Sequence, residues 1–322
     1  MADLTACALA CRSANTAEWQ AVLPRTKCHE ASKEHYISRF LANGMIEPFK
    51  VMQGFVPEIL DGSGSNGKVA ILMLDQSKIA NEFECLMVSL RIGERAIPIA
   101  WKVVKTKGEI GFDIQRELLD EVASLVPEGT QILLAADRFY GTASLVKWCK
   151  NHKWQYRVRL KGNLIFSHEG GEITSGAAAK IKMTMLQNAT FNNTDVTTNI
   201  GILHQPDHPE PWIIAMDCLP SKHKVLDYGM RWGIECMFSD FKSRGFCITK
   251  THLKHEDRIE RMILILTIAL YWAVSTGMQP RNVKASFLKK ILQIDNLILQ
   301  IRAAFLTESR SYANLHTKAV GV

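Results

Sequence analysis

The sequence predicts an α/β protein: a mixed sheet flanked by helices, with a β-rich insertion and a helical N-terminal region. Two uninterrupted apolar runs, 69–74 and 132–136, are typical of strands that are buried on both faces. Two further apolar segments, 83–91 and 95–104, flank Ile92-Gly93-Glu94 and indicate a hairpin. Helical patterns separate the later strands. The expected order is therefore strand, strand, strand, helix, strand, helix, strand, which is typical of a mixed sheet covered by helices.

The N-terminal region 1–60 is expected to be helical. Four short helices are predicted at about 4–12, 16–23, 32–43 and 46–60. The basic and imidazole side chains of this region fit two interpretations equally, a module that contacts DNA or a helical cap on the main domain. These side chains are His29, Lys33, His35 and Arg39. The glycine- and serine-rich stretch 61–67 predicts a flexible linker and a domain boundary.

Residues 67–162 are expected to form the first part of the main domain. Its two buried strands each end on an acidic residue, Asp75 after the first and Asp137 after the second. Two helices are predicted at about 113–126 and 141–152, and a further strand at 153–160.

Residues 163–219 are rich in Gly, Ala, Asn and Thr and predict a β-rich insertion, with strands at 198–204 and 212–216. The second part of the main domain is expected at 220–306. Helices are predicted there at about 222–244, 257–277 and 283–304, followed by a frayed tail at 307–322. The stretch 262–278 is the most apolar of the chain. It is at the lower limit of length for a membrane span and predicts a core helix.

The charge distribution favours a polyanionic partner. The chain carries a formal net charge of +7, and the segment 138–161 contains seven Lys and Arg residues with no Asp or Glu. The eight cysteines show neither a Cys-x2-Cys pair nor the Cys/His spacing of a zinc site. They are predicted to be buried thiols of a reducing compartment. Because the N-terminus also lacks the basic flank of a signal peptide, we expect a cytoplasmic protein.

Three carboxylates are candidates for one site. Asp75 and Asp137 follow buried strands, and ligand sites in such sheets gather where strands end. Glu235 lies on a predicted helix that can pack against the sheet. Converging carboxylates need a cation, and Mg²⁺ or Mn²⁺ is the natural one, since a pair of such ions promotes phosphoryl transfer. Each acid alone also has a structural interpretation, as a cap, a turn or a solvated residue.

The helix predicted at 222–244 presents two faces. Tyr228, Arg231, Glu235 and Lys242 fall within about 60° of one another at 100° per residue. An adjacent apolar stripe forms the docking face and consists of Met230, Ile234, Met237 and Phe241. The alternative for Arg231 and Glu235 is an ordinary surface ion pair four residues apart.

The pattern Tyr228-x2-Arg231-x3-Glu235-x6-Lys242 resembles the YREK signature of the IS4-type DDE transposases, bacterial insertion-sequence enzymes with an RNase H-like core. The resemblance covers roughly residues 30–280. It extends to Leu74-Asp75, to 136–139 (Ala-Asp-Arg-Phe), to 156–163 (Tyr-Arg-Val-Arg-Leu-Lys-Gly-Asn) and to 242–245 (Lys-Ser-Arg-Gly). Asp75 is followed by Gln-Ser, where many relatives carry a small residue and Thr or Ser, and this departure does not touch the acid.

The resemblance implies that Asp75, Asp137 and Glu235 are the catalytic residues and the ligands of two Mg²⁺ (or Mn²⁺) ions. It implies a DNA endonuclease and strand transferase. Such an enzyme cleaves double-stranded DNA at the terminal inverted repeats of its mobile element and joins the freed 3′-OH to target DNA. It would act as a homodimer or larger assembly on DNA, at the nucleoid of a bacterial cytoplasm. Two alternatives remain open, a catalytically silent DNA-binding regulator and a two-metal nuclease that only hydrolyses.

Several residues are candidates for DNA binding. Tyr228, Arg231 and Lys242 are expected beside the scissile phosphate. On the strand 153–160, Arg157 and Arg159 alternate with apolar residues and predict a basic face. The remaining candidates are Arg138, Lys161 and Trp212. Relatives use an aromatic residue of the insertion to hold a flipped base, but for Trp212 a core position is favoured. The basic face could equally be an ordinary solvated surface.

Overall fold

The computed structural model describes residues 1–25, 29–64, 69–80, 82–179, 183–204 and 209–278. The chain divides into two compact units, Asp3–Tyr271 together with Met1, and Trp272–Val322 together with Ala2. All of the sheet and nearly all of the helices described below belong to the first unit. The helix predicted at 283–304 and the tail at 307–322 lie outside the described residues.

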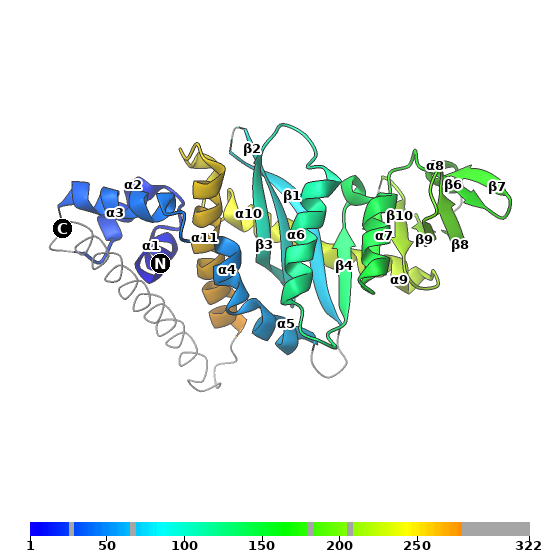
Figure 1. Ribbon diagram of the computed structural model, residues 1–322, viewed down its shortest axis with the longest axis horizontal. Helices are drawn as coiled ribbons and strands as arrows, with labels where there is room; N and C mark the ends of the chain where they lie inside the picture. The colour runs from blue at the N-terminus through cyan, green and yellow to red at the C-terminus, as the bar shows by residue number, and fades with distance from the viewer. Residues whose placement is uncertain (26–28, 65–68, 81, 180–182, 205–208, 279–322) are drawn as a thin grey trace, which may run out of the picture. The chain divides into compact units, whose positions relative to one another are not determined.

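The sheet begins with five strands in the order β3-β2-β1-β4-β5; the first four are labelled in Figure 1. Their bounds are β1 Ala70–Ala80, β2 Phe83–Ile92, β3 Arg95–Lys105, β4 Ile132–Ala136 and β5 Gln155–Arg159. The first three strands form an antiparallel meander. β4 then pairs parallel with β1 and β5 parallel with β4. The predicted RNase H-like mixed sheet is confirmed.

The residues predicted as an insertion extend this sheet. They form β6 Ile165–His168, β7 Gly171–Thr174, α8 Ser175–Ala178, β8 Met183–Phe191, β9 Thr197–Leu203 and β10 Trp212–Met216. β10 runs antiparallel to β5, with Ile214 opposite Arg159. The order continues β5-β10-β9-β8-β6-β7, so the described residues contain one mixed sheet of ten strands.

Helices cover both faces of the core strands. Along β3, Trp101 donates a hydrogen bond to the Glu260 carbonyl of α11 (Glu256–Met278), at 3.2 Å. The next residue, Lys102, forms an ion pair with Glu121 of α6 (Phe112–Leu125), at 3.0 Å. Because successive side chains of a strand point to opposite faces, α11 and α6 lie on opposite sides of the sheet. α7 (Ala143–Asn151) lies beside α6, whereas α10 (Trp232–Phe241) packs on β1–β3 (Figure 1).

The apolar stretch predicted at 262–278 lies in the core as far as Leu270, whereas Trp272 of the same stretch is 42% exposed. Within the described part of the chain, Glu256–Thr276 is the one stretch of helix long and apolar enough to cross a membrane. Its apolar side chains from Ile259 to Leu270, apart from the half-buried Ile268, are nevertheless at most 7% exposed. Arg261 of the same helix is also buried and donates hydrogen bonds to the carbonyls of Leu41 and Ile46. The burial of these side chains is that of a core helix.

The N-terminal helices are α1 Ala2–Cys11, α2 Thr16–Val22, α3 Glu30–Ala42, α4 Pro48–Gln53 and α5 Val56–Gly64. Two predictions are wrong here. The helix expected at 46–60 is interrupted at Gly54-Phe55, and residues 61–64 of the expected linker continue α5. Val56 and Leu60 of α5 are fully buried. Their packing outweighs the cost of about 1 kcal/mol that each glycine imposes on a helix. Residues 65–67 lie outside the described residues.

Two further boundaries differ from the prediction. β1 does not end before Asp75 but continues to Ala80, because its pairing with β2 runs on to Ala80 and Phe83. The helix expected at 222–244 is divided into α9 Lys222–Leu226, a 3₁₀ turn η3 Asp227–Arg231, and α10. Gly229 and Gly233 favour helix weakly, and a tighter 3₁₀ turn costs little over so short a stretch.

Candidate active site

Asp75 and Asp137 lie side by side where the parallel pairing of β1 with β4 stops. The last partners in that ladder are Leu74 and Ala136, and each aspartate is the next residue of its segment. Asp75 remains within β1, opposite Met87 of β2. Asp137 leaves the sheet and is the residue before the 3₁₀ turn η2 (Arg138–Tyr140), where its side chain makes no capping hydrogen bond. Both carboxylates therefore project from the edge where the prediction expected them, although Asp75 is not at a strand end.

The guanidinium of Arg231 lies at the centre of the predicted carboxylates. It donates to Asp75 Oδ2 at 3.1 Å, to Glu235 Oε1, and through Nε to the Tyr228 hydroxyl at 2.9 Å. The Tyr228 hydroxyl donates in turn to Asp137 Oδ1, at 3.0 Å. Arg231 thus joins Asp75 and Glu235 directly and Asp137 through Tyr228.

The local helical geometry accounts for this arrangement. The 3₁₀ turn η3 has three residues per turn, so Tyr228 and Arg231 stack on one another. The chain then enters α10, where residues four apart are neighbours, and Glu235 lies one turn beyond Arg231. The spacing of three and then four residues therefore places the side chains of Tyr228, Arg231 and Glu235 on the same side of this segment. The surface ion pair considered as an alternative is present between Arg231 and Glu235, but Arg231 is only 8% exposed.

Burial perturbs the charges of this cluster. It raises the pKa of Asp75 from 3.8 to about 6; Arg231 and the Gln76 amide oppose this, while Asp137 and Glu235 add to it. Burial also disfavours the charged form of Arg231, but Tyr228 and the three carboxylates outweigh it and raise its pKa. Arg231 is therefore always charged, whereas Asp75 gains or loses its proton near pH 6.

Lys242 contacts β1 near Asp75, through a serine and not through Arg231. It is the residue at which α10 ends, and its Nζ donates to Ser77 Oγ of β1 at 2.6 Å. Burial lowers the pKa of Lys242. Ser77 was not among the predicted site residues. Its position two residues after Asp75 on the same strand, and hence on the same face, was the signal that could have identified it.

The structure shows these carboxylates around an arginine and does not show a metal centre. Within the parts of the chain that are described, no group of three or more His, Cys, Asp or Glu side chains lies close enough to hold a metal ion. The donors are nevertheless of the right chemistry, since carboxylate oxygens are the ligands that Mg²⁺ and Mn²⁺ prefer. In the present arrangement Arg231 supplies positive charge to the same carboxylates.

The prediction that Arg157 contributes to an exposed basic face is wrong. Its side chain is 1% exposed and forms ion pairs with Asp217 at 2.7 Å and with Asp227 at 3.6 Å. Its Nε also donates to the carbonyl of Lys224 in α9, at 3.1 Å. β5 lies between β4 and β10, and α9 approaches the face on which Arg157 lies. Arg157 is therefore part of the folded core.

The other predicted basic residues are more accessible. Arg138 and Arg159 both form ion pairs with Glu210, at 3.0 and 3.2 Å. Lys161 pairs with Glu109 at 3.2 Å, and its Nζ lies 5.2 Å from the centre of the Phe139 ring. These residues follow Asp137 or lie at and just beyond the end of β5, so they adjoin the carboxylate cluster.

Trp212 supports Tyr228. It is the first residue of β10, and its ring meets the Tyr228 ring edge-on with centroids 5.3 Å apart. It packs against an apolar cluster of Leu203, Ile214, Met216, Val225 and Tyr228. A Cβ on Gly229 would lie 3.6 Å from the Trp212 ring, an ordinary van der Waals distance, so this packing does not require a glycine. Trp212 is therefore partly buried at the edge of this cluster rather than within the core.

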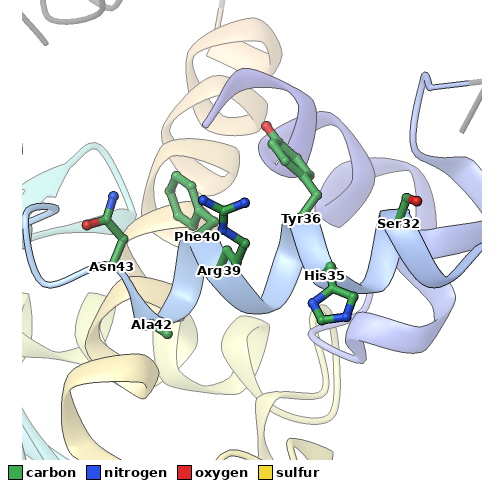
Figure 2. A pocket seen from close by; sticks show the side chains of 7 residues that line it. All are labelled: Ser32, His35, Tyr36, Arg39, Phe40, Ala42 and Asn43. Atoms are coloured by element: carbon green, nitrogen blue, oxygen red, sulfur yellow. The ribbon is translucent and has the colours of Figure 1, made fainter. Parts of the chain in front are cut away.

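A hollow lies along α3, and none of the three candidate carboxylates lines it (Figure 2). Its volume is about 750 Å³, and it is lined by Ser32, His35, Tyr36, Arg39, Phe40, Ala42 and Asn43. His35 and Arg39 are among the residues considered for DNA contact, whereas Lys33 donates to the Gln20 carbonyl of α2 at 3.2 Å. None of the acidic candidates Asp75, Asp137 and Glu235 lines this hollow.

Comparison with known proteins identifies one family. Residues 111–272, half of the chain, match the family described as Transposase DDE domain. The matched span contains Asp137 and Glu235 and begins after Asp75. No curated protein matches the chain.

Proposed function

The chain belongs to the family of transposase DDE domains, and we propose that it is an IS4-type transposase whose catalytic residues are Asp75, Asp137 and Glu235. The family acts on DNA and generally uses divalent metal ions. The observation that carries the proposal is the network around Arg231. It brings acids from three segments, distant in sequence, into one charged cluster.

The proposed cofactor is a pair of Mg²⁺ or Mn²⁺ ions held by Asp75, Asp137 and Glu235. When bound, such a pair activates the attacking oxygen and stabilises the leaving oxygen of a phosphodiester. The protein's part is to hold the three carboxylates at one place, where Asp75 must be ionised to act as a ligand. Because its pKa is about 6, this requires a pH above 6 when no metal ion is bound.

The proposed substrate is double-stranded DNA, first at the terminal inverted repeats of the mobile element and then at a target. Water would be the first nucleophile and the freed 3′-OH the second. Tyr228, Arg231 and Lys242 would hold the reacting strand; to donate to a phosphate oxygen, Tyr228 and Arg231 would exchange their present hydrogen bonds with the carboxylates for bonds to the phosphate. Arg138, Arg159 and Lys161 would hold the strand further along. Action as a homodimer or larger assembly in the bacterial cytoplasm completes the proposal.

The test is the substitution Glu235→Gln. Glutamine keeps the size of the side chain and can still accept from Arg231, but it is a poor ligand for Mg²⁺. We expect metal-dependent nicking of a plasmid that carries the DNA flanking the coding region to disappear, while binding of that DNA is retained. Glu82→Gln is the matched control, because Glu82 forms a surface ion pair with Lys105 and should leave cleavage unchanged.

Cleavage by Glu235→Gln at the rate of the wild type would refute the assignment. The products of the wild type distinguish the alternatives. Nicks without joined products would indicate a nuclease that only hydrolyses, and tight binding without nicks would indicate a DNA-binding regulator.

A further inference from the structure

A cavity of about 640 Å³ adjoins the carboxylate cluster and has a strongly basic lining. Its charged and aromatic members are Arg138, Phe139, Arg159, Lys161, His204 and Glu210. Phe139 is 43% exposed although it is a large apolar side chain. Arg138 directly follows Asp137, and Arg159 acts electrostatically on Tyr228, which holds Asp137. The cavity therefore lies next to the proposed reaction centre.

Two arginines of this cavity converge on one oxygen. The Oε2 atom of Glu210 accepts a hydrogen bond from Arg138 at 3.0 Å and another from Arg159 at 3.2 Å. The arginines come from separate segments, η2 after β4 and the end of β5. Two guanidinium groups donating to one anionic oxygen is also the arrangement by which proteins hold a phosphate.

Glu210 is the exposed member of this group. Its side chain is 59% exposed, against 44% for Arg138 and 19% for Arg159. It immediately precedes Pro211 at the start of β10, outside any helix or strand. Exposed ion pairs contribute little to stability because water and salt screen them. Glu210 can therefore be displaced from the arginines, at the modest cost of two partly screened ion pairs, whereas Arg159 is held at the end of its strand.

We propose that Arg138 and Arg159 form a binding site for a backbone phosphate of the DNA substrate, and that Glu210 occupies this site in the free protein as an internal competitor. This inference rests on the proposed function. A DNA phosphate replaces the carboxylate oxygen and keeps both arginines paired. Glu210 thus lowers the affinity for DNA of any sequence, and DNA that binds must displace it.

The test is the affinity of the full chain for a fluorescently labelled DNA duplex of mixed sequence, measured in EDTA so that the proposed metal-dependent cleavage cannot occur. Glu210→Gln removes the competing charge, and we expect it to bind the duplex roughly tenfold more tightly than the wild type. Asp195→Asn is the matched control. It removes the same charge from another exposed ion pair, with Lys147, which does not line the cavity. It should change the affinity by less than about twofold, a purely long-range effect.

A combined variant separates the local effect from net charge. When Arg138 and Arg159 are both replaced by Gln, the further change Glu210→Gln should no longer tighten binding, and thermal melting establishes that each variant is folded. Equal gains from Glu210→Gln and Asp195→Asn, or a gain that persists without the arginines, would overturn the inference.

The outcome for the proposed function is read separately, from cleavage by the wild type in Mg²⁺. A tenfold gain in binding with no cleavage would support the phosphate site and refute the catalytic assignment. Cleavage by the wild type without tighter binding by Glu210→Gln would support the catalytic assignment and refute the phosphate site. If neither the wild type nor Glu210→Gln binds the duplex, both are wrong.

Discussion

Replacing Asp75 by Asn should make the metal-free protein more stable while removing its proposed activity. The Asp75 side chain is only 16% exposed, and burial raises its pKa from 3.8 to about 6, with Asp137 and Glu235 adding to the effect. The charged form is therefore disfavoured in the folded state. Asparagine has nearly the same shape and can still accept from Arg231, but it carries no charge to bury.

The magnitude follows from the two pKa values. A tenfold change in the protonation equilibrium corresponds to about 1.36 kcal/mol, so the difference between 3.8 and about 6 amounts to about 3 kcal/mol. The folded state binds the proton more tightly than the unfolded state, so stability falls as the pH rises from about 4 through 6. At pH 7.5 the full cost is present. Near pH 4 Asp75 is protonated in the folded state and a little under half protonated in the unfolded state, so less than about 1 kcal/mol remains.

Urea denaturation in EDTA between pH 4 and pH 7.5 measures this effect. We expect Asp75→Asn to exceed the wild type by up to about 3 kcal/mol at pH 7.5, with the advantage shrinking steadily toward pH 4. Asp113→Asn is the control, because the Asp113 carboxylate is 88% exposed and its loss should change stability by less than about 0.5 kcal/mol. A variant less stable than the wild type at pH 7.5, or an advantage that does not depend on pH, would refute the reasoning.

Two further predictions concern residues that support the site without belonging to the carboxylate cluster. Arg157→Met should lower the free energy of unfolding by about 3–5 kcal/mol, measured by urea denaturation, because it leaves Asp217 without its buried partner; an unchanged stability would contradict the buried ion pair. Gly141→Ala should lower it by about 1–3 kcal/mol and reduce cleavage, since the new Cβ would lie 2.4 Å from the Arg159 carbonyl oxygen. Gly44→Ala, which meets nothing within 4 Å, should show neither effect.

The strands of the core were largely predictable from local patterns. The segments predicted at 132–136 and 212–216 coincide with β4 and β10. Both are short apolar runs bounded by turn-forming or polar residues, so their ends are marked in the sequence itself. The end of β1 was missed because it depends on pairing with β2, which continues past Asp75 to Ala80. No local sequence pattern indicates how far β1 stays paired with β2, because the pairing depends on residues of both strands.

The helix around Glu235 shows the limit of helical periodicity. The predicted grouping of Tyr228, Arg231 and Glu235 is correct, although the segment changes from 3₁₀ to α geometry between them. A spacing of three residues fits the first geometry and a spacing of four fits the second. The contact made by Lys242, the last residue of the predicted face, was not foreseen. Its Nζ donates to Ser77 of β1, a residue far away in the sequence.

By itself the sequence determined the class of sheet, the two aspartates that follow the apolar runs of β1 and β4, and the spacing that joins Tyr228, Arg231 and Glu235. These depend on apolar patterning and on contacts between residues close in the chain. Only the tertiary structure decided which charges meet. Arg231 bridges Asp75 and Glu235, Arg157 is buried between Asp217 and Asp227, and Glu210 holds Arg138 and Arg159. Alternation along a strand shows that two residues share a face, but it cannot show what covers that face, because the covering elements come from distant parts of the chain.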